Sequence, residues 1–206
     1  MRRCGIRAVL WWSAGLGTLV ATGAWIRAGA SGLLFYDREG LMLANAWRSP
    51  WLDGVFLGLT WLGSLMVLLP LGLAIGVLLW RGGHRGEAGV LIAVLLGASL
   101  LAQLAKRLAL RPRPDLFPAL TSVAEPFSFP SAHAAQVTAV AAALLLVAAR
   151  LAPRCRRWAI PLALSIVALV CISRVYLQVH YPSDVLAGIF AAACWMVGLR
   201  ALMLKG

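Results

Sequence analysis

Long apolar segments alternate with short polar ones along this chain, and the apolar segments are long enough to cross a bilayer as helices. A membrane-spanning helix needs about 20 mostly apolar residues. Six segments meet this requirement: roughly 8–26, 55–79, 88–106, 132–149, 158–177 and 184–203. They fill the chain, and no linker, repeat or low-complexity tract divides it. We therefore predict an all-α fold, an integral-membrane bundle of six transmembrane helices that forms a single domain over residues 1–206.

Composition supports a membrane protein, because 62% of the residues are hydrophobic and the mean hydropathy is +0.86. The net charge of +12 would suggest a nucleic-acid partner in a soluble domain. Six spans, however, place eleven of the nineteen basic residues on one side of the membrane: Arg2, Arg3, Arg7, Arg81, Arg85, Arg150, Arg154, Arg156, Arg157, Arg200 and Lys205. By the positive-inside rule this side is the cytoplasm. We predict a multi-pass protein of the inner (plasma) membrane with cytoplasmic termini, no nucleic-acid partner and no obligatory protein partner.

The first apolar segment could be a cleaved signal peptide or a retained anchor. It follows basic residues and ends near Ala28-Gly29-Ala30, which resembles a signal peptidase site. Its apolar stretch is long for a signal peptide, so we interpret it as a retained anchor. Residues 30–54 mix apolar and charged positions in a way that suits a short helix on the membrane surface. This segment is either a simple connection or a lid over an entry route for lipid. In the second apolar segment, Pro70 is expected to kink the helix.

Three short polar strings lie at the outer ends of the later spans. They are Lys106-x6-Arg113-Pro114, Pro130-Ser131-Ala132-His133 and Ser173-Arg174-x5-His180-x3-Asp184. Ionisable residues are expensive at the ends of apolar segments, so a functional role is the default interpretation. None of the four cysteines falls in an outer loop or forms a pair with metal-ligand spacing, so we predict no disulfide and no metal site.

The strings contain the groups needed to bind a phosphate. Lys106, Arg113 and Arg174 can neutralise phosphate oxygens, and arginine matches two oxygens with its fork. Ser131 is a good N-cap for the fourth span. Free backbone N–H groups near Ser131 and Ala132 would then form an anion site at a helix N-terminus.

The strings also contain the groups needed to cleave a phosphate. Asp184 could accept the Nδ1 proton of His180 and leave Nε2 free to attack phosphorus. His133 could protonate the leaving oxygen and later activate water. We interpret Arg107 and Arg111 differently, as cations that extend to the membrane interface. We expect the helix of the third span to stop near Arg111, because a proline follows it.

Together the three strings resemble the pattern of the type 2 phosphatidic acid phosphatase family, related to the vanadium haloperoxidases: Lys-x6-Arg-Pro, Pro-Ser-Gly-His and Ser-Arg-x5-His-x3-Asp. The resemblance implies an integral-membrane lipid phosphatase that needs no metal or other cofactor. It implies His180 as nucleophile, Asp184 as its partner and His133 as general acid and base. It further implies that four residues bind phosphate: Lys106, Arg113, Ser131 and Arg174. Ala132 stands where the family has glycine; alanine keeps its N–H, so we expect activity to survive.

The sequence leaves the exact substrate open. The resemblance implies a lipid phosphate in the bilayer, either undecaprenyl pyrophosphate or phosphatidylglycerol phosphate or phosphatidate, cleaved at the outer, periplasmic face through a phosphohistidine. Lipid A phosphatase activity and phosphate transfer between lipids are alternatives within the family. A non-catalytic protein that binds or translocates lipid would keep the cations and tolerate loss of the histidines, so the intact His133, His180 and Asp184 argue against it. A further alternative is a haloperoxidase that binds vanadate at the same anion site. The membrane spans argue against it, because the haloperoxidases are soluble.

Overall fold

A computed structural model describes residues 2–29 and 34–203 of the chain. The elements are α1 (Arg2–Ala28), α2 (Phe35–Ala46), α3 (Pro50–Leu59), the 3-10 helix η1 (Thr60–Gly63), α4 (Leu65–Arg81), α5 (Arg85–Ala109), α6 (Ala132–Leu151), the 3-10 helix η2 (Pro153–Cys155), α7 (Arg156–Tyr176) and α8 (Pro182–Met203). The predicted all-α class is confirmed, since the described residues contain no strand beyond one isolated bridge between Pro112 and Phe127.

Within the described ranges, five helices are long and apolar enough to cross a membrane: Gly5–Ala28, Arg85–Ala109, Ala132–Leu151, Pro153–Tyr176 and Pro182–Leu202. The remaining predicted span, the second along the chain, is broken, because its two parts, Pro50–Gly63 and Leu65–Arg81, meet at a bend of 47°. We expected the irregularity at Pro70, but Pro70 lies inside α4 and the break lies at Ser64. The Ser64 side chain caps α4 by accepting a hydrogen bond from the Met66 N–H at 3.2 Å.

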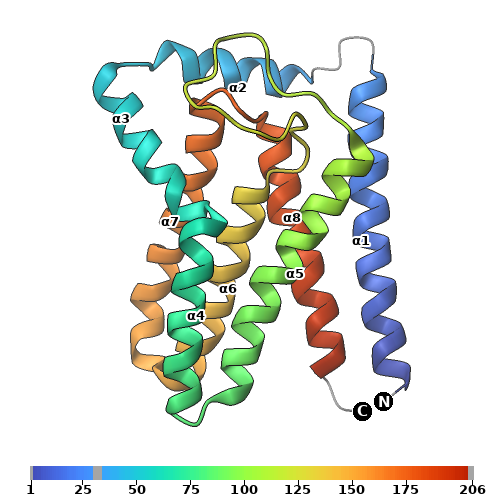
Figure 1. The fold of residues 1–206 in the computed structure, drawn as a ribbon, viewed down its shortest axis with the longest axis vertical. Helices are drawn as coiled ribbons and strands as arrows, with labels where there is room; N and C mark the ends of the chain where they lie inside the picture. Colours follow the sequence, from blue (N-terminus) through green and yellow to red (C-terminus); the bar gives the residue numbers. More distant parts are fainter. Residues whose placement is uncertain (1, 30–33, 204–206) are drawn as a thin grey trace.

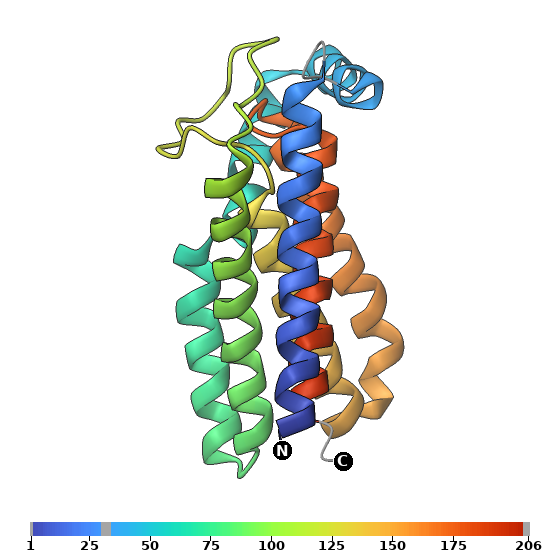
Figure 2. The ribbon, with the colours of Figure 1, turned by 90° about the vertical axis from the view of Figure 1, so that its right-hand side faces the viewer.

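The bundle is built around α5, α6 and α8 (Figure 1). Helix α1 packs against α8 and α5, α4 packs against α5, and α7 packs against α6; Figure 2 shows α1 running alongside α8. The main core cluster joins α5 and α6 through fully or almost fully buried side chains such as Leu91, Leu95, Val137, Val140 and Ala143. Small residues allow helices to approach closely in a membrane, and Gly97 of α5 is such a contact point with α8.

The bundle has two chemically different ends (Figure 1). The start of α1, the end of α8 and the turns after α4 and α6 share one end, which carries the basic segments. The loop from 110 to 131, the link between α7 and α8, and the helices α2 and α3 lie at the other end. Residues 30–33 of the segment 30–54 lie outside the described residues; within the rest, α2 is a short helix, as expected, and it runs across the end of the bundle (Figures 1 and 2). All three polar strings therefore meet at the end that α2 crosses.

The packing of α5 on α8 predicts that Gly97→Ala destabilises the protein. A Cβ at Gly97 would meet the Trp195 ring at 1.7 Å. That ring cannot easily move, because it stacks on Trp12 at 4.4 Å between centroids and donates from Nε1 to the Ala93 carbonyl oxygen at 2.9 Å. We expect the free energy of unfolding to fall by about 1–3 kcal/mol, measured by thermal unfolding in detergent.

Gly89→Ala in the same helix is the matched control. A Cβ at Gly89 has no neighbour within 4 Å. This substitution should leave stability unchanged or raise it by about 0.5–1 kcal/mol, because alanine favours a helix interior. Equal behaviour of the two variants would contradict the close approach of α5 and α8.

Candidate active site

The three polar strings come together at one end of the bundle (Figure 1). The first string ends α5 and continues into the loop 110–131, the second opens α6, and the third joins the last turn of α7 to the first turn of α8. A hydrogen bond from the Ser131 N–H to the Asp184 carbonyl oxygen at 2.9 Å ties the start of α6 to the start of α8. Gly188 lets this contact form, because a Cβ there would lie 2.4 Å from the Ser131 carbonyl oxygen.

Arg113 brings the loop 110–131 against the link between α7 and α8. Its Nε donates to the Glu125 carbonyl oxygen and its Nη1 to the Val179 carbonyl oxygen, both at 2.7 Å. Its Nη1 also lies 3.4 Å from Nε2 of His180. Burial lowers the pKa of the Arg113 guanidinium, although arginine stays charged under ordinary conditions. Arg113, one of the three expected cations, therefore lies directly beside His180, the expected nucleophile.

Lys106 and Arg174 are the other two expected cations, and both are buried. Lys106 Nζ donates to the Phe127 carbonyl oxygen at 3.1 Å, which leaves two of its three N–H donors for a ligand. Arg174 Nη1 donates to the Thr60 hydroxyl of η1. Its Nε has no hydrogen-bond partner within the described ranges. An anion between these side chains would fill donor positions that the protein leaves open.

His180 is held between a carboxylate and a cation. Its Nδ1 lies 3.4 Å from Oδ2 of Asp184, while its Nε2 faces Arg113. Arg113 can only donate and an ionised Asp184 can only accept. Both neighbours therefore favour the same tautomer, with the proton on Nδ1 and the lone pair on Nε2. Burial, followed by the positive charges of Lys106, Arg174 and Arg113 and by His133, lowers the pKa of His180 well below 6.5, so the ring is neutral and its Nε2 can act as a nucleophile.

The second string supplies a helix N-terminus and the second histidine. The Ser131 hydroxyl accepts a hydrogen bond from the Ala134 N–H at 3.5 Å, as expected for an N-cap. Ala132 is the first residue of α6, so its backbone is helical and a side chain is tolerated there. His133 follows in the same turn, close enough to influence the charge state of His180. All eight residues expected from the sequence thus lie at the same end of the bundle.

Two charged residues of this region, Arg111 and Asp37, were not recognised as part of it from the sequence. Arg111 was expected to extend to the membrane interface, which is wrong: its side chain is 1% exposed and forms ion pairs with Asp37 and Asp184. Arg107, in contrast, is exposed as expected. Helix α5 ends at Ala109, two residues before the predicted stop, with Leu110 at φ 54°. No local pattern separated Arg111 from the exposed Arg107, because the partners of Arg111 lie far away in the sequence.

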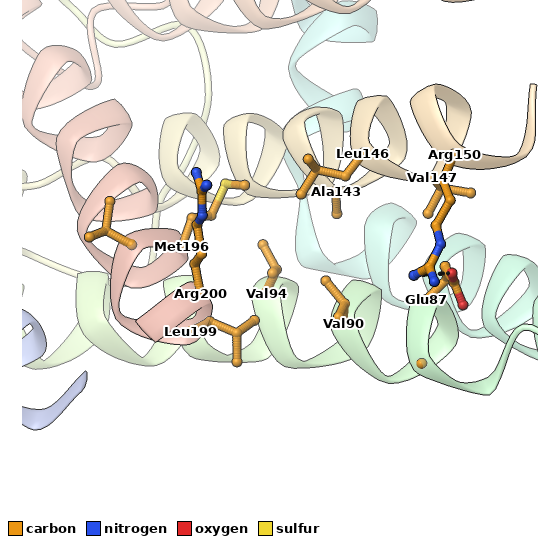
Figure 3. A pocket seen from close by; sticks show the side chains of 12 residues that line it. Glu87, Val90, Val94, Ala143, Leu146, Val147, Arg150, Met196, Leu199 and Arg200 are labelled. Atoms are coloured by element: carbon orange, nitrogen blue, oxygen red, sulfur yellow. Dashed lines mark ion pairs between the residues drawn. The ribbon is translucent and has the colours of Figure 1, made fainter. Parts of the chain in front are cut away.

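One sizeable cavity lies away from this site. It has a volume of about 660 Å³ and lies between α5, α6 and α8 near the basic end of the bundle (Figure 3). Its wall is apolar except for a few residues, among them Glu87 and Arg150, which form an ion pair at 2.8 Å. It contains none of the residues of the three strings. A smaller apolar groove of about 320 Å³ lies between α4, α6 and α7 and includes Leu62 of η1.

Fold and site together define a helical membrane protein with a cluster of cations near two histidines. Residues 87–205, which include all three strings, match the family model of the PAP2 superfamily. Phosphatidylglycerophosphatase B of Bacillus subtilis is 37% identical over 145 residues, which cover 68% of this chain and 70% of that protein. The chain belongs to the PAP2 superfamily, and it is a lipid phosphatase of that family.

Further relatives agree with this assignment. Decaprenylphosphoryl-5-phosphoribose phosphatase of Mycobacterium tuberculosis is 42% identical over 98 residues, 47% of this chain and 50% of that protein. The crystal structure of a transmembrane PAP2-type phosphatidylglycerolphosphate phosphatase from Bacillus subtilis superimposes with a TM-score of 0.78 and 28% identity, over 97% of this chain and 98% of that one. LpxE from Aquifex aeolicus shares the fold, with a TM-score of 0.65 at 24% identity over 81% of this chain and 96% of that one.

The burial of His180 predicts that acid destabilises the protein. Its pKa in the folded state lies well below 6.5, whereas the unfolded chain has an ordinary histidine with a pKa of about 6.5. Between these two values the unfolded chain binds more protons, so the contribution of His180 is complete above pH 6.5 and is lost as the pH falls. The expected slope is up to about 1.4 kcal/mol per pH unit for this group.

Thermal unfolding in detergent between about pH 7 and pH 5 measures this slope. His180→Asn should show a weaker dependence on pH than the wild type. His84→Asn is the control, because His84 lies in the turn before α5, at the other end of the bundle. A wild-type slope in His180→Asn would show that His180 does not titrate with unfolding.

Proposed function

We propose that the protein removes a phosphate group from a membrane lipid through a covalent phosphohistidine at His180. The observation that carries this proposal is the orientation of His180, whose Nδ1 faces Asp184 and whose Nε2 faces Arg113. The cation that would bind a phosphate oxygen is thus adjacent to the atom that would attack phosphorus. Phosphoryl transfer depends mainly on positioning and on neutralisation of the equatorial oxygens. Lys106, Arg113 and Arg174 would neutralise these oxygens.

The reaction would proceed in two steps. The lone pair of His180 Nε2 attacks phosphorus, the bond from phosphorus to the lipid oxygen breaks, and His133 donates a proton to that oxygen. Water then attacks the phosphohistidine, His133 takes a proton from the water, and the bond from Nε2 to phosphorus breaks. Asp184 stabilises the positive imidazole ring during both steps. The N–H groups at the start of α6, near Ser131 and Ala132, supply hydrogen bonds to the phosphate.

The lipid chain would lie in the apolar groove between α4, α6 and α7. The groove has a volume of about 320 Å³ and is lined by apolar side chains that include Leu62, Val67, Leu71, Val140, Leu144 and Ile166. It begins next to the site, since a Cβ on the neighbouring Gly63 would lie 3.2 Å from the Cβ of His133. A lipid seated in this groove would present its headgroup to the cations.

Phosphatidylglycerol phosphate is the first substrate to test, because the more extensively matched relative is named a phosphatidylglycerophosphatase. The mycobacterial relative is named for a phosphorylated sugar on a polyprenyl phosphate. The two named substrates differ in both headgroup and tail. This difference supports a site that recognises a terminal phosphate next to a long apolar chain, a class that also includes phosphatidate and undecaprenyl pyrophosphate.

Activity should depend on His180 and persist in EDTA. Release of inorganic phosphate from phosphatidylglycerol phosphate, phosphatidate and undecaprenyl pyrophosphate would be measured in detergent. We expect His180→Asn to lower kcat by about 10³-fold or more, because the nucleophile is lost. We expect EDTA to leave the rate unchanged, because Lys106, Arg113 and Arg174 provide the neutralising charge.

His84→Asn is the matched control for this substitution and should keep the wild-type rate. A radiolabelled substrate should label the wild-type protein in acid-quenched samples and leave His180→Asn unlabelled. Equal phosphate release by the wild type and His180→Asn would exclude His180 as the nucleophile. Loss of activity in EDTA would exclude the metal-independent mechanism.

We further propose that the site faces the outside of the cell and that both termini are cytoplasmic. The support is the positive-inside rule together with the clustering of the basic segments at the end opposite the site. Cys155 is exposed at the basic end and provides an internal reference. A cysteine introduced as Leu116→Cys would lie in the outer loop, where Leu116 is 41% exposed.

A membrane-impermeant maleimide applied to intact spheroplasts tests this orientation. It should label Leu116→Cys in a Cys155→Ser background and fail to label Cys155 in the otherwise unchanged chain. Permeabilisation should make Cys155 reactive. Labelling of Cys155 alone in sealed spheroplasts would reverse the proposed orientation.

A further inference from the structure

Arg111 lies at the centre of a buried ionic network that joins α2 to the start of α8. Its Nη1 donates to Oδ1 of Asp184 at 2.6 Å and its Nη2 to Oδ2 of Asp37 at 2.7 Å. Asp37 and Asp184 are 1% and 0% exposed. The Arg111 guanidinium also lies 3.9 Å from the centre of the Tyr181 ring. One cation thus bridges two buried carboxylates that come from opposite ends of the sequence.

The two oxygens of Asp184 have different partners. Oδ1 accepts from Arg111, whereas Oδ2 accepts from the Tyr181 N–H at 2.9 Å and faces Nδ1 of His180. A carboxylate that is held at one oxygen cannot rotate freely about its bond to the chain. The guanidinium and the Tyr181 N–H therefore hold the carboxylate at both oxygens and fix where Oδ2 stands relative to the imidazole ring. The guanidinium also compensates the charge that Asp184 must keep in order to accept a hydrogen bond from the Nδ1–H group.

The network also fastens α2 to the bundle. Asp37 accepts from the Ser183 N–H at 2.8 Å and from the Ser183 hydroxyl at 2.7 Å. One turn further along α2, Gly40 approaches α8 so closely that a Cβ would lie 2.5 Å from Cγ of Pro182. Gln178 Nε2 adds a hydrogen bond to the Leu41 carbonyl oxygen at 3.1 Å. The side of α2 that faces the bundle is thus joined to the segment that carries His180.

We propose that Arg111 is a positioning residue that holds Asp184 against His180 and, through Asp37, links the seating of α2 to the orientation of the nucleophile. This inference rests on the proposed role of His180. The role is distinct from phosphate binding, because Nη1 and Nη2 of Arg111 donate to Asp184 and Asp37. Arg111 would act on the reaction through Asp184.

The test compares Arg111→Lys and Asp37→Asn with the wild type. Lysine keeps the charge but lacks the fork that bridges two carboxylates. We expect Arg111→Lys to lower kcat by roughly 10–100-fold, as loss of a supporting partner does in other sites, with KM changed by less than about threefold because phosphate-binding groups are untouched. Asp37→Asn keeps the Arg111–Asp184 pair and should lower kcat by about threefold to tenfold.

A spectroscopic signal reports on His180 without catalysis. The chain contains three histidines, so ¹⁵N-histidine spectra in detergent are simple, and His180→Asn identifies the His180 resonances. In the wild type we expect the tautomer with the proton on Nδ1. In Arg111→Lys and Asp37→Asn the His180 resonances should move, while those of His84 stay in place. Arg107→Lys is the control, because Arg107 is an exposed arginine of α5. This substitution should change neither the spectrum nor kcat.

Several results would overturn the inference. A folded Arg111→Lys variant with unchanged His180 resonances or an unchanged kcat would do so. Arg111→Lys is not informative if it is misfolded, which would appear as a loss of cooperative unfolding. In that case Asp37→Asn decides: His180 resonances and a kcat equal to those of the wild type in this variant would refute the link between α2 and the nucleophile. Failure of the wild type to release phosphate from every lipid tested would reject the proposed function instead, and the spectra would still decide whether Arg111 orients His180.

Discussion

The charge balance at one end of an apolar bundle governs the structure of this protein. Buried charges are tolerated only when they are paired and hydrogen-bonded. Here the two buried carboxylates, Asp37 and Asp184, are both paired with Arg111. Across the part of the chain that the structure describes, no carboxylate lies within ion-pair distance of Lys106, Arg113 or Arg174. Asp37 and Asp184 thus hold the elements of the site together through Arg111. Lys106, Arg113 and Arg174 keep a positive charge that no carboxylate of the described residues neutralises and that could bind an anion.

This division of charge leaves three cations that would suit a phosphate. Lys106 and Arg113 are held by carbonyl oxygens and Arg174 by a hydroxyl, so each side chain is oriented without being neutralised. A carboxylate in their place would compete with the substrate. The same positive charges, together with burial, keep His180 neutral. A neutral imidazole is the form that can attack phosphorus, so the cations that we propose to bind the anion would also keep the proposed nucleophile in its reactive state.

The sequence was sufficient to predict five of the spans and the gathering of eight polar residues at one end of the bundle, because both signals are local. Apolar length identifies a span, and charged residues at span ends identify the site. Arg111 and Asp37 were missed for a different reason. The two carboxylates that pair with Arg111 lie 73 and 74 positions away from it, in opposite directions along the chain. Nothing in the local pattern distinguishes a buried ion pair from a cation or an acid at a membrane interface. Only the folded chain shows that α2 closes over the start of α8.

The break in the second span illustrates how an irregularity can be required by the site. The segment from Pro50 to Arg81 changes direction by 47° at Ser64 and does not continue as one straight helix. In the observed geometry η1 stands beside the site: Thr60 accepts a hydrogen bond from Arg174, and Gly63 lies against His133. Below the bend, α4 forms one wall of the apolar groove. The two sides of the bend thus contribute a polar contact to the cluster of cations and one wall of the neighbouring apolar groove, an arrangement that would suit a lipid with a phosphate at one end.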